Sequence, residues 1–306
     1  MKSILTLSLL PFAIVYALTG LAVSAAQPEL HLEEQVDGYV EPYLDTGNFS
    51  GTILIGRGDE IFSKGYGFAN VEKKTLNGPG TSFYLASTSR IFTSAAILLL
   101  EQRGKLSVDD LLARYLPDWP RGDEITIHHL LTLSAGLPNI NELPGYGSWS
   151  RSPQTPASLC QKFRDLPLEF EPGTRSVHSN SNYNLLALLI ERLSGQTYGE
   201  FLEQAFFEPL GMTHTAHDSE SDRTVEHRAL GYTPVGLAEL RPAPTLDWSV
   251  KTGNGSIYST VEDLYRLTAC WWRSRYSTTS PSPSCSRSTF RAMDTAGSLN
   301  RAPGRR

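Results

Sequence analysis

The feature that most constrains this chain is an unbroken apolar segment, residues 95–100, which follows a stretch rich in serine and threonine, residues 87–94. A helix that is apolar on all sides is stable only where other elements cover it. The fold must therefore contain a sizeable core, which 306 residues with 40% hydrophobic content can supply. Gly104 is expected to end this helix, and the polar run places Ser87 and Ser89 at its start.

A serine at the start of a buried helix has two interpretations. The simpler one is an N-cap, which satisfies a free amide of the first turn. The functional one is a nucleophile, because the helix N-terminus favours negative charge there. A base at position i+3 lies on the same helical face and reaches the hydroxyl, which is how the S-x-x-K motif works. Ser87 and Ser89 are both candidates, and Arg occupies position 90.

Periodicity on either side predicts a mixture of helices and strands. Apolar residues recur at helical spacing over residues 29–46, and alternation over residues 49–68 predicts a β-hairpin with a turn at 57–59. Further helices are expected at residues 157–164 and 183–193, the second ended by Gly195.

Six ordered blocks resemble the serine β-lactamase and penicillin-binding protein family, in particular its class C, D-aminopeptidase and esterase-like branch. The blocks are FYLASTSRIFT (83–93), ITIHHLLTLSAGLP (125–138), EPG (171–173), HSNSNYNLL (178–186), FEPLGMTHT (207–215) and GSIYSTVEDL (255–264). The resemblance spans roughly residues 33–270 and implies an α+β fold of the β-lactamase/transpeptidase type. Such a fold has an antiparallel sheet flanked by helices and a helical subdomain. It also implies acyl-enzyme hydrolysis of β-lactam, D-amino peptide or ester bonds.

The resemblance assigns four catalytic positions. Ser87 takes the role of the nucleophile, with its backbone N–H as one oxyanion donor. Asn180 takes the role of the amide that orients the substrate and the neighbours of Ser87. Arg90 stands where the family has lysine, and His178 stands where the family has tyrosine.

Both replacements bear on activity. A guanidinium stays protonated, so Arg90 cannot accept the proton of the serine, whereas imidazole is a competent base near neutral pH. One hypothesis is a Ser87–His178 dyad with Arg90 as electrostatic support. We favour a second, in which both changes mark a serine hydrolase with little or no turnover. A third is a non-catalytic protein that binds peptide or cell-wall ligands.

Residues 271–306 differ in composition from the rest of the chain. They contain seven Arg, one Asp, eight Ser and three Pro, a pattern typical of a disordered basic tail. The third motif of the family, K-T-G or H-x-G, is expected after the 255–264 block and is not spelled there. Lys251-Thr252-Gly253 spells it before that block, which we interpret as a coincidence. We therefore expect a truncated or frameshifted member whose C-terminal strands are missing and whose sheet has an open edge.

The N-terminus has the pattern of a secretory signal. Lys2 precedes an apolar run over residues 4–23, and small residues follow at 24–26. We expect a signal peptide at 1–26, a hydrolase domain at 27–270 and the tail at 271–306. The protein would then be exported, with no membrane span after cleavage and a membrane anchor if cleavage fails.

Composition excludes other classes of protein. A net charge of −5 provides no basic surface for nucleic acid. The histidines form no H-x-x-x-H pair with acidic support, so we expect no metal and no cofactor. An exported protein could pair two of its three cysteines, but their odd count and wide spacing favour free thiols. The expected partner is a small-molecule or peptide substrate, and the oligomeric state stays open.

Overall fold

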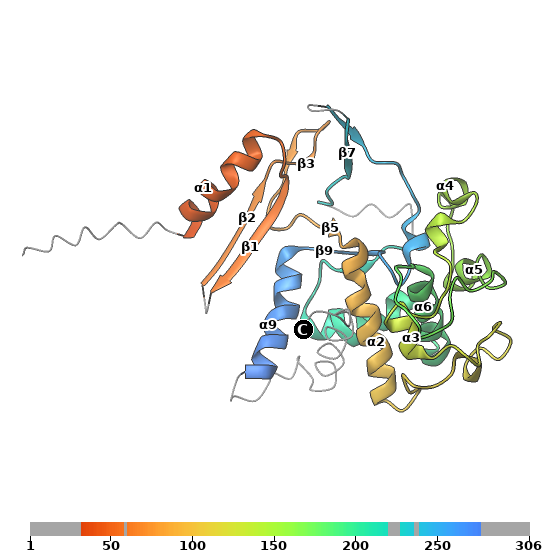
Figure 1. Cartoon of the computed structure of the whole chain (residues 1–306). Helices are drawn as coiled ribbons and strands as arrows, with labels where there is room; N and C mark the ends of the chain where they lie inside the picture. Colours follow the sequence, from red (N-terminus) through yellow and green to blue (C-terminus); the bar gives the residue numbers. More distant parts are fainter. Residues whose placement is uncertain (1–31, 58–59, 220–226, 236–238, 277–306) are drawn as a thin grey trace, which may run out of the picture.

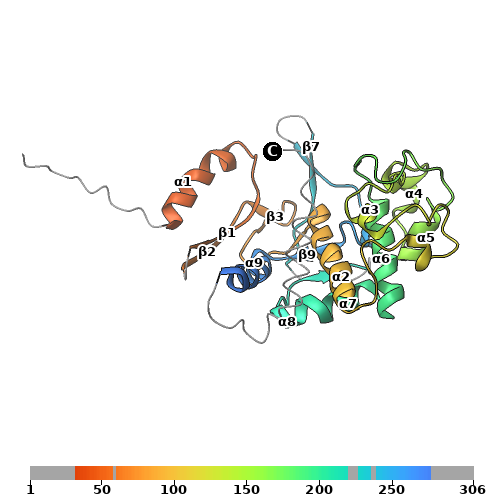
Figure 2. The same cartoon turned by 60° about the horizontal axis from the view of Figure 1, so that its bottom comes forward.

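Two packed regions meet along a short central sheet. The computed structural model describes residues 32–57, 60–219, 227–235 and 239–276. An N-terminal helix, a β-hairpin and the last helix form one region, and a cluster of helices around α2 and α6 forms the other (Figures 1 and 2). The short strands β5 and β9 lie between these regions (Figure 1).

The first region is built on the predicted hairpin. β1 (Gly51–Arg57) and β2 (Glu60–Tyr66) pair antiparallel. The amphipathic helix α1 (Leu32–Asp45) buries Val36 and Val40 against Tyr66. Lys64 of β2 reaches Asp37 of α1 at 2.7 Å. The predicted helix and hairpin are therefore both present, and α1 covers one face of the hairpin.

The last helix, α9 (Val261–Tyr276), packs against the other face of the same hairpin. An added Cβ on Gly56 of β1 would lie 2.5 Å from the ring of Tyr265 of α9. Because real Cβ atoms do not approach that closely, only glycine lets the helix lie so near the strand. α9 extends past residue 270, where we had expected regular structure to end.

The helical region contains the main core. The predicted apolar helix is α2 (Arg90–Gln102), and the helix predicted at 183–193 is α6 (Ser181–Ser194), ended by Gly195 with φ +74°. The two helices pack together, and residues 95–100 of α2 are all buried. The smaller helices around them are α3 (Ile127–Leu131), α4 (Tyr146–Trp149), α5 (Pro156–Gln161), α7 (Tyr198–Leu202) and α8 (Glu208–Leu210).

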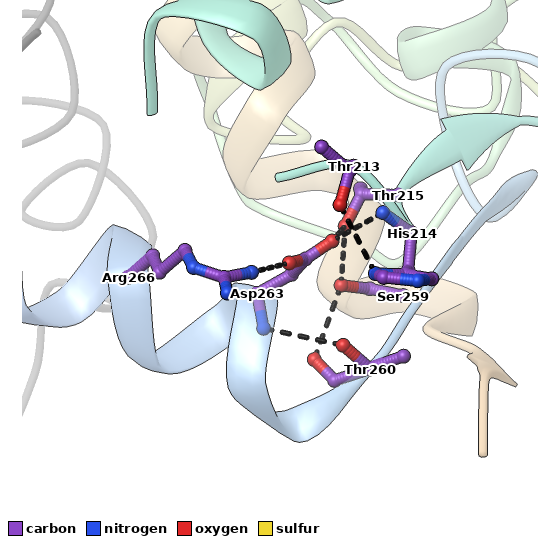
Figure 3. A network of polar contacts seen from close by, with 7 residues as sticks. All are labelled: Thr213, His214, Thr215, Ser259, Thr260, Asp263 and Arg266. Carbon is purple, nitrogen blue, oxygen red and sulfur yellow. Dashed lines mark hydrogen bonds and ion pairs between the residues drawn. The ribbon is translucent and has the colours of Figure 1, made fainter. Parts of the chain in front are cut away.

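The central sheet ties the serine segment to the chain before α9. β5 (Phe83–Tyr84) and β6 (Ala216–His217) both pair antiparallel with β9 (Ile257–Ser259). The fully buried Asp263 of α9 fixes the corner between these elements (Figure 3). Its carboxylate accepts from His214 N at 2.8 Å and Thr215 Oγ1 at 2.9 Å, and it pairs with Arg266.

The remaining strands form two further antiparallel pairs. They are β3 (Phe68–Asn70) with β4 (Thr75–Leu76) and β7 (Tyr232–Val235) with β8 (Glu239–Pro242). The expected α+β class with antiparallel strands and a helical subdomain is thus confirmed. In the part of the chain that the structure describes, β1 and β2 pair only with each other, so the strands form several small sheets rather than one.

The structure does not describe the two ends of the chain, and it corrects one expectation about the cysteines. Residues 1–26 and 277–306 lie outside the described residues, so the expected signal and most of the expected tail do too. No helix within the described ranges is long and apolar enough to cross a bilayer. Cys160 is a buried free thiol as expected, but Cys270 is disulfide-bonded, which makes the expectation of a free thiol wrong there.

Candidate active site

Ser87 lies in a tight connection between the central sheet and the buried helix. The 3₁₀ turn η1 (Ala86–Ser89) joins β5 to α2, and the Ser87 side chain is exposed. The residue before it, Ala86, has φ +46°, a left-handed conformation that non-glycine residues seldom adopt. Such strain is concentrated at functional sites, where the surrounding structure maintains it. Lys74, Arg121, Leu133 and His227 share this conformation among the described residues, so at Ser87 the strain supports a functional position only together with the exposure of its side chain.

The structure also separates the two candidate serines. Ser89 occupies the N-cap position of α2, is fully buried, and makes no side-chain cap. Its hydroxyl instead accepts from the backbone N–H of Ile257 at 3.2 Å. Ser87 is not the N-cap, so the simpler interpretation of this residue does not hold. Of the two hydroxyls, only that of Ser87 is open to a ligand.

Arg90 is the centre of the polar contacts at this site. Its Nη2 donates to Nε2 of His178 at 2.9 Å and to Oδ1 of Asn180 at 2.6 Å. The guanidinium also lies over the ring of Tyr183, 5.1 Å from the centroid. Burial lowers the pKa of Arg90, yet a guanidinium remains a cation in proteins. One side chain of α2 thus gathers the two other predicted polar residues.

The contact with Arg90 fixes the protonation state of His178. Because a guanidinium can only donate, Nε2 of His178 must be the acceptor, and the ring proton lies on Nδ1. Burial and the neighbouring charge of Arg90 lower the pKa of His178. The imidazole is therefore neutral at pH 7, and the lone pair that could serve as a base is already engaged.

Asn180 is positioned by the loop that precedes η3 (Ile140–Glu142). Its backbone N–H, at the N-cap position of α6, donates to Oδ1 of Asn139 at 3.1 Å. The residues that follow these two also contact each other, because the Ser181 hydroxyl oxygen accepts from the backbone N–H of Ile140 at 2.9 Å. The sequence did not single out Asn139, because its role depends on the 125–138 block folding back onto the start of α6.

Ser87 itself has no base at hydrogen-bonding distance. In the described part of the chain its hydroxyl makes no hydrogen bond. Of the four predicted residues, the structure brings together Arg90, His178 and Asn180 through direct contacts, and leaves Ser87 one helical turn before Arg90 without a partner.

Lys251 is the residue that the sequence interpretation missed. Its Nζ donates to Oδ1 of Asn141 at 3.0 Å and lies 5.0 Å from the ring centroid of Tyr146. Burial and the charge of Arg90 lower its pKa to about 8. The spelling Lys251-Thr252-Gly253 was a signal, which we set aside because it precedes the 255–264 block. Lys251 lies shortly before β9 in the chain, and β9 pairs with the serine segment. This proximity could have identified Lys251 as a residue of the site.

The described residues contain no cluster of histidine, cysteine or carboxylate side chains able to hold a metal ion. The described side chains of the site supply a hydroxyl, an amide, an imidazole and two cations.

A family model and several curated proteins match this chain. Residues 36–298 match the family model described as beta-lactamase. PbpX of Bacillus subtilis (strain 168), which carries the name of a penicillin-binding protein, is 33% identical over 229 residues, covering 74% of this chain and 56% of that protein. The chain spans about half the length of the curated relatives it matches.

Solved structures show the same fold. A penicillin-binding protein from Bacillus halodurans superposes with a TM-score of 0.67 at 30% identity, covering 77% of this chain and 73% of that one. A D-amino acid amidase from Ochrobactrum anthropi SV3, complexed with L-phenylalanine amide, superposes with a TM-score of 0.70. That match has 22% identity and covers 79% of this chain and 71% of the amidase, so it shows the fold alone.

Proposed function

The chain belongs to the beta-lactamase family, and from that premise we propose that it is a serine hydrolase-like protein, with Ser87 as its nucleophile, whose acylation step is impaired. Arg90, His178 and Asn180 complete the site as charge, imidazole and amide. The ligand is a small molecule or peptide with an acyl group, of the size of an amino acid derivative. β-Lactam, D-amino peptide and ester bonds are all compatible with this chemistry.

One observation carries the proposal: Arg90 donates to His178 Nε2 at 2.9 Å and to Asn180 Oδ1 at 2.6 Å. Attack by a serine hydroxyl needs a group that accepts its proton in the transition state. The cation at position 90 cannot accept it, and the imidazole nitrogen that could is itself an acceptor from that cation. His178 is thus the one candidate base among the predicted residues, and its contact with Arg90 engages the nitrogen that would act.

The expected size of the defect follows from what a base contributes. A positioned general base accelerates proton transfer by about 10²–10⁴-fold. Positioning and oxyanion donors act independently of the base, so residual reactivity at Ser87 is expected to be above that of an ordinary surface serine. We therefore expect slow acylation by activated reagents rather than complete inertness.

The Ser87–His178 dyad is the competing catalytic hypothesis. It requires Arg90 to release Nε2 and the imidazole to move to the Ser87 hydroxyl, at the cost of the Arg90 contact. In that case replacing His178 with Ala would abolish acylation of the wild-type protein. If acylation is impaired as we propose, the same replacement changes an already slow rate by less than tenfold.

A non-catalytic binding role is the second candidate function. It is favoured by the exposure of Ser87 beside two cations, Arg90 and Lys251, whose polar partners are neutral. Such a site retains the means to hold a ligand even where turnover is lost.

Labelling with a fluorophosphonate or a fluorescent penicillin tests the proposal. We expect slow labelling of the wild-type protein and none of Ser87→Ala. A double variant, Arg90→Lys with His178→Tyr, restores the residue types that the family has at these positions and should label faster by roughly 10²-fold. Fast labelling of the wild-type protein would overturn the impairment.

We also propose that the protein is exported, on the basis of the Lys2 and apolar pattern of residues 1–26. Expression of the full chain in a secreting host, followed by N-terminal sequencing, tests this. A mature N-terminus close to Gln27 supports export with cleavage, and an intact Met1 on cytosolic protein contradicts it.

A further inference from the structure

The loop that carries Lys251 lies directly against the backbone next to Ser87. An added Cβ on Gly255 would be 3.6 Å from Cα and C of Ala86 and 3.4 Å from Cβ of Lys251. The Lys251 carbonyl accepts from the N–H groups of Asn254 and Gly255, at 2.9 and 2.8 Å, so the loop turns tightly at this point. The Cβ atom of Lys251 and the backbone of Ala86 thus both lie close to Gly255.

Neighbouring contacts hold this loop in place. Thr93 of α2 donates its hydroxyl hydrogen to the Gly253 carbonyl at 2.6 Å, and Asn184 of α6 donates to the Thr252 carbonyl at 2.8 Å. Both contacts are buried. The position of Lys251 relative to the serine segment is therefore set by the two central helices rather than by the loop alone.

The Lys251 ammonium has neutral polar partners. Its Nζ contacts the amide oxygen of Asn141 and the ring of Tyr146. Within the described ranges, neither Lys251 nor Arg90 takes part in an ion pair with a carboxylate. Glu142, which follows Asn141 in the chain, accepts from the Asn139 side-chain amide at 2.8 Å.

Arg90 and Lys251 both lose hydration where they are partly buried, and no carboxylate of the described residues pairs with either of them. The lost hydration is therefore not offset by an ion pair, which lowers the stability of the folded protein. Arg90 lies almost entirely within the protein and spends its Nη2 on His178 and Asn180. Lys251 is more exposed, and an ammonium has three donors, of which one goes to Asn141. Lys251 is thus the cation that a ligand can reach.

We propose that Lys251 is a specificity-determining residue that binds a carboxylate substituent on the ligand held at Ser87. The inference rests on the proposed function, since it takes Ser87 as the position of the reacting group. It names the ligand class: acyl compounds with an acidic side chain, such as derivatives of acidic amino acids. Burial and the charge of Arg90 lower the pKa of Lys251.

Two ligands that differ in one charged group test this directly. N-acetyl-D-glutamate α-amide carries a side-chain carboxylate, and N-acetyl-D-glutamine α-amide is its neutral isostere. Binding of each to the full chain is measured by titration calorimetry at pH 7, which needs no turnover. A charge-assisted hydrogen bond predicts that the acidic ligand binds roughly tenfold more tightly than the neutral one.

Variants identify the residue responsible. Lys251→Met should bring the two affinities to within about twofold of each other, and Lys251→Arg should keep the preference. Lys105→Met removes the same charge from an exposed lysine beyond the end of α2 and should leave the preference unchanged. The preference should also decline as the pH rises from 7 to 10, because Lys251 loses its charge with a pKa of about 8.

The pH dependence depends on which groups face Lys251. These are Arg90 of α2, whose charge lowers the pKa of Lys251, and Tyr146 of α4, whose ring centroid lies 5.0 Å from the Lys251 ammonium. Burial raises the pKa of Tyr146, and Arg90 keeps its proton throughout, so neither titrates between pH 7 and 9. The decline over that interval therefore reports Lys251.

The outcomes separate this inference from the proposed function. Equal affinity of wild-type protein for the two ligands, no measurable binding of the acidic ligand at millimolar concentration, or a preference that survives in Lys251→Met overturns the inference. None of these results concerns the acylation rate. Fast fluorophosphonate labelling overturns the impairment and leaves the binding preference standing, and measurements on Ser87→Ala should give the same preference as the wild type.

Discussion

Replacing Arg90 with Met should raise the pKa of His178. Arg90 donates to Nε2 of His178 at 2.9 Å, so a proton can bind there only after that hydrogen bond breaks. The resulting imidazolium would also face a guanidinium. Burial and this charge together hold the pKa of His178 below its ordinary value of 6.5. Met covers the aliphatic part of the Arg90 side chain and removes the charge and the donor.

The size of the change can be worked from the contact. A hydrogen bond involving a charged group contributes about 1.5–3 kcal/mol, and solvent screens this one because the His178 side chain is exposed. The contact therefore contributes no more than the lower end of this range, and the substitution should raise the pKa of His178 toward its ordinary value of 6.5.

The ¹H and ¹³C signals of the His178 Cε1–H group, followed by NMR between pH 4.5 and 8.5, measure this change. His178→Gln assigns the signal. His129 is the internal control, because burial and the neighbouring His128 cause its lowered pKa and Arg90 does not. The reasoning is refuted if His178 of the wild-type protein titrates above 6.5, or if Arg90→Met leaves its midpoint unchanged.

Two further predictions concern the framework of the site and are measured by urea denaturation. Gly253→Ala should destabilise the fold by about 3 kcal/mol or more, because φ is +86° and the new Cβ would lie 2.1 Å from the Tyr183 carbonyl oxygen. Gly195→Ala, with a similar φ and no neighbour within 4 Å, should cost only about 1 kcal/mol. Asp263→Ala should cost about 3 kcal/mol, since it leaves buried donors unpaired, whereas Arg266→Ala, at 45% exposure, should cost under about 1 kcal/mol. Equal losses within either pair would contradict the packing described.

Local sequence patterns were sufficient for the elements that make their own contacts. The apolar run at 95–100 required a buried helix, and α2 provides it. Alternation over 49–68 required a hairpin, and β1 and β2 form it. Ordered blocks identified the family, which the match over residues 36–298 confirms. In each case the signal lies within a short stretch of chain.

Contacts between distant segments could not be predicted in the same way. The sequence marked Arg90 and His178 as replacements of family residues. Only the fold shows that Arg90 donates a hydrogen bond to the Nε2 lone pair of His178. The Lys251-Thr252-Gly253 spelling marked Lys251 but not its location, because the approach of its loop to Ala86 depends on the pairing of β5 with β9. The strands β5 and β6 are two residues long each, too short to produce any periodic signal.

The central claim is that the Arg90–His178 contact, and not the loss of the nucleophile, limits acylation at Ser87. The most direct measurement is the rate of fluorophosphonate labelling of four proteins: the wild type, Ser87→Ala, Arg90→Lys/His178→Tyr, and the same double variant carrying Ser87→Ala. The account predicts slow labelling of the wild type, faster labelling of the double variant by roughly 10²-fold, and none wherever Ser87 is absent. Equal rates for the wild type and the double variant, or labelling that persists without Ser87, would contradict it.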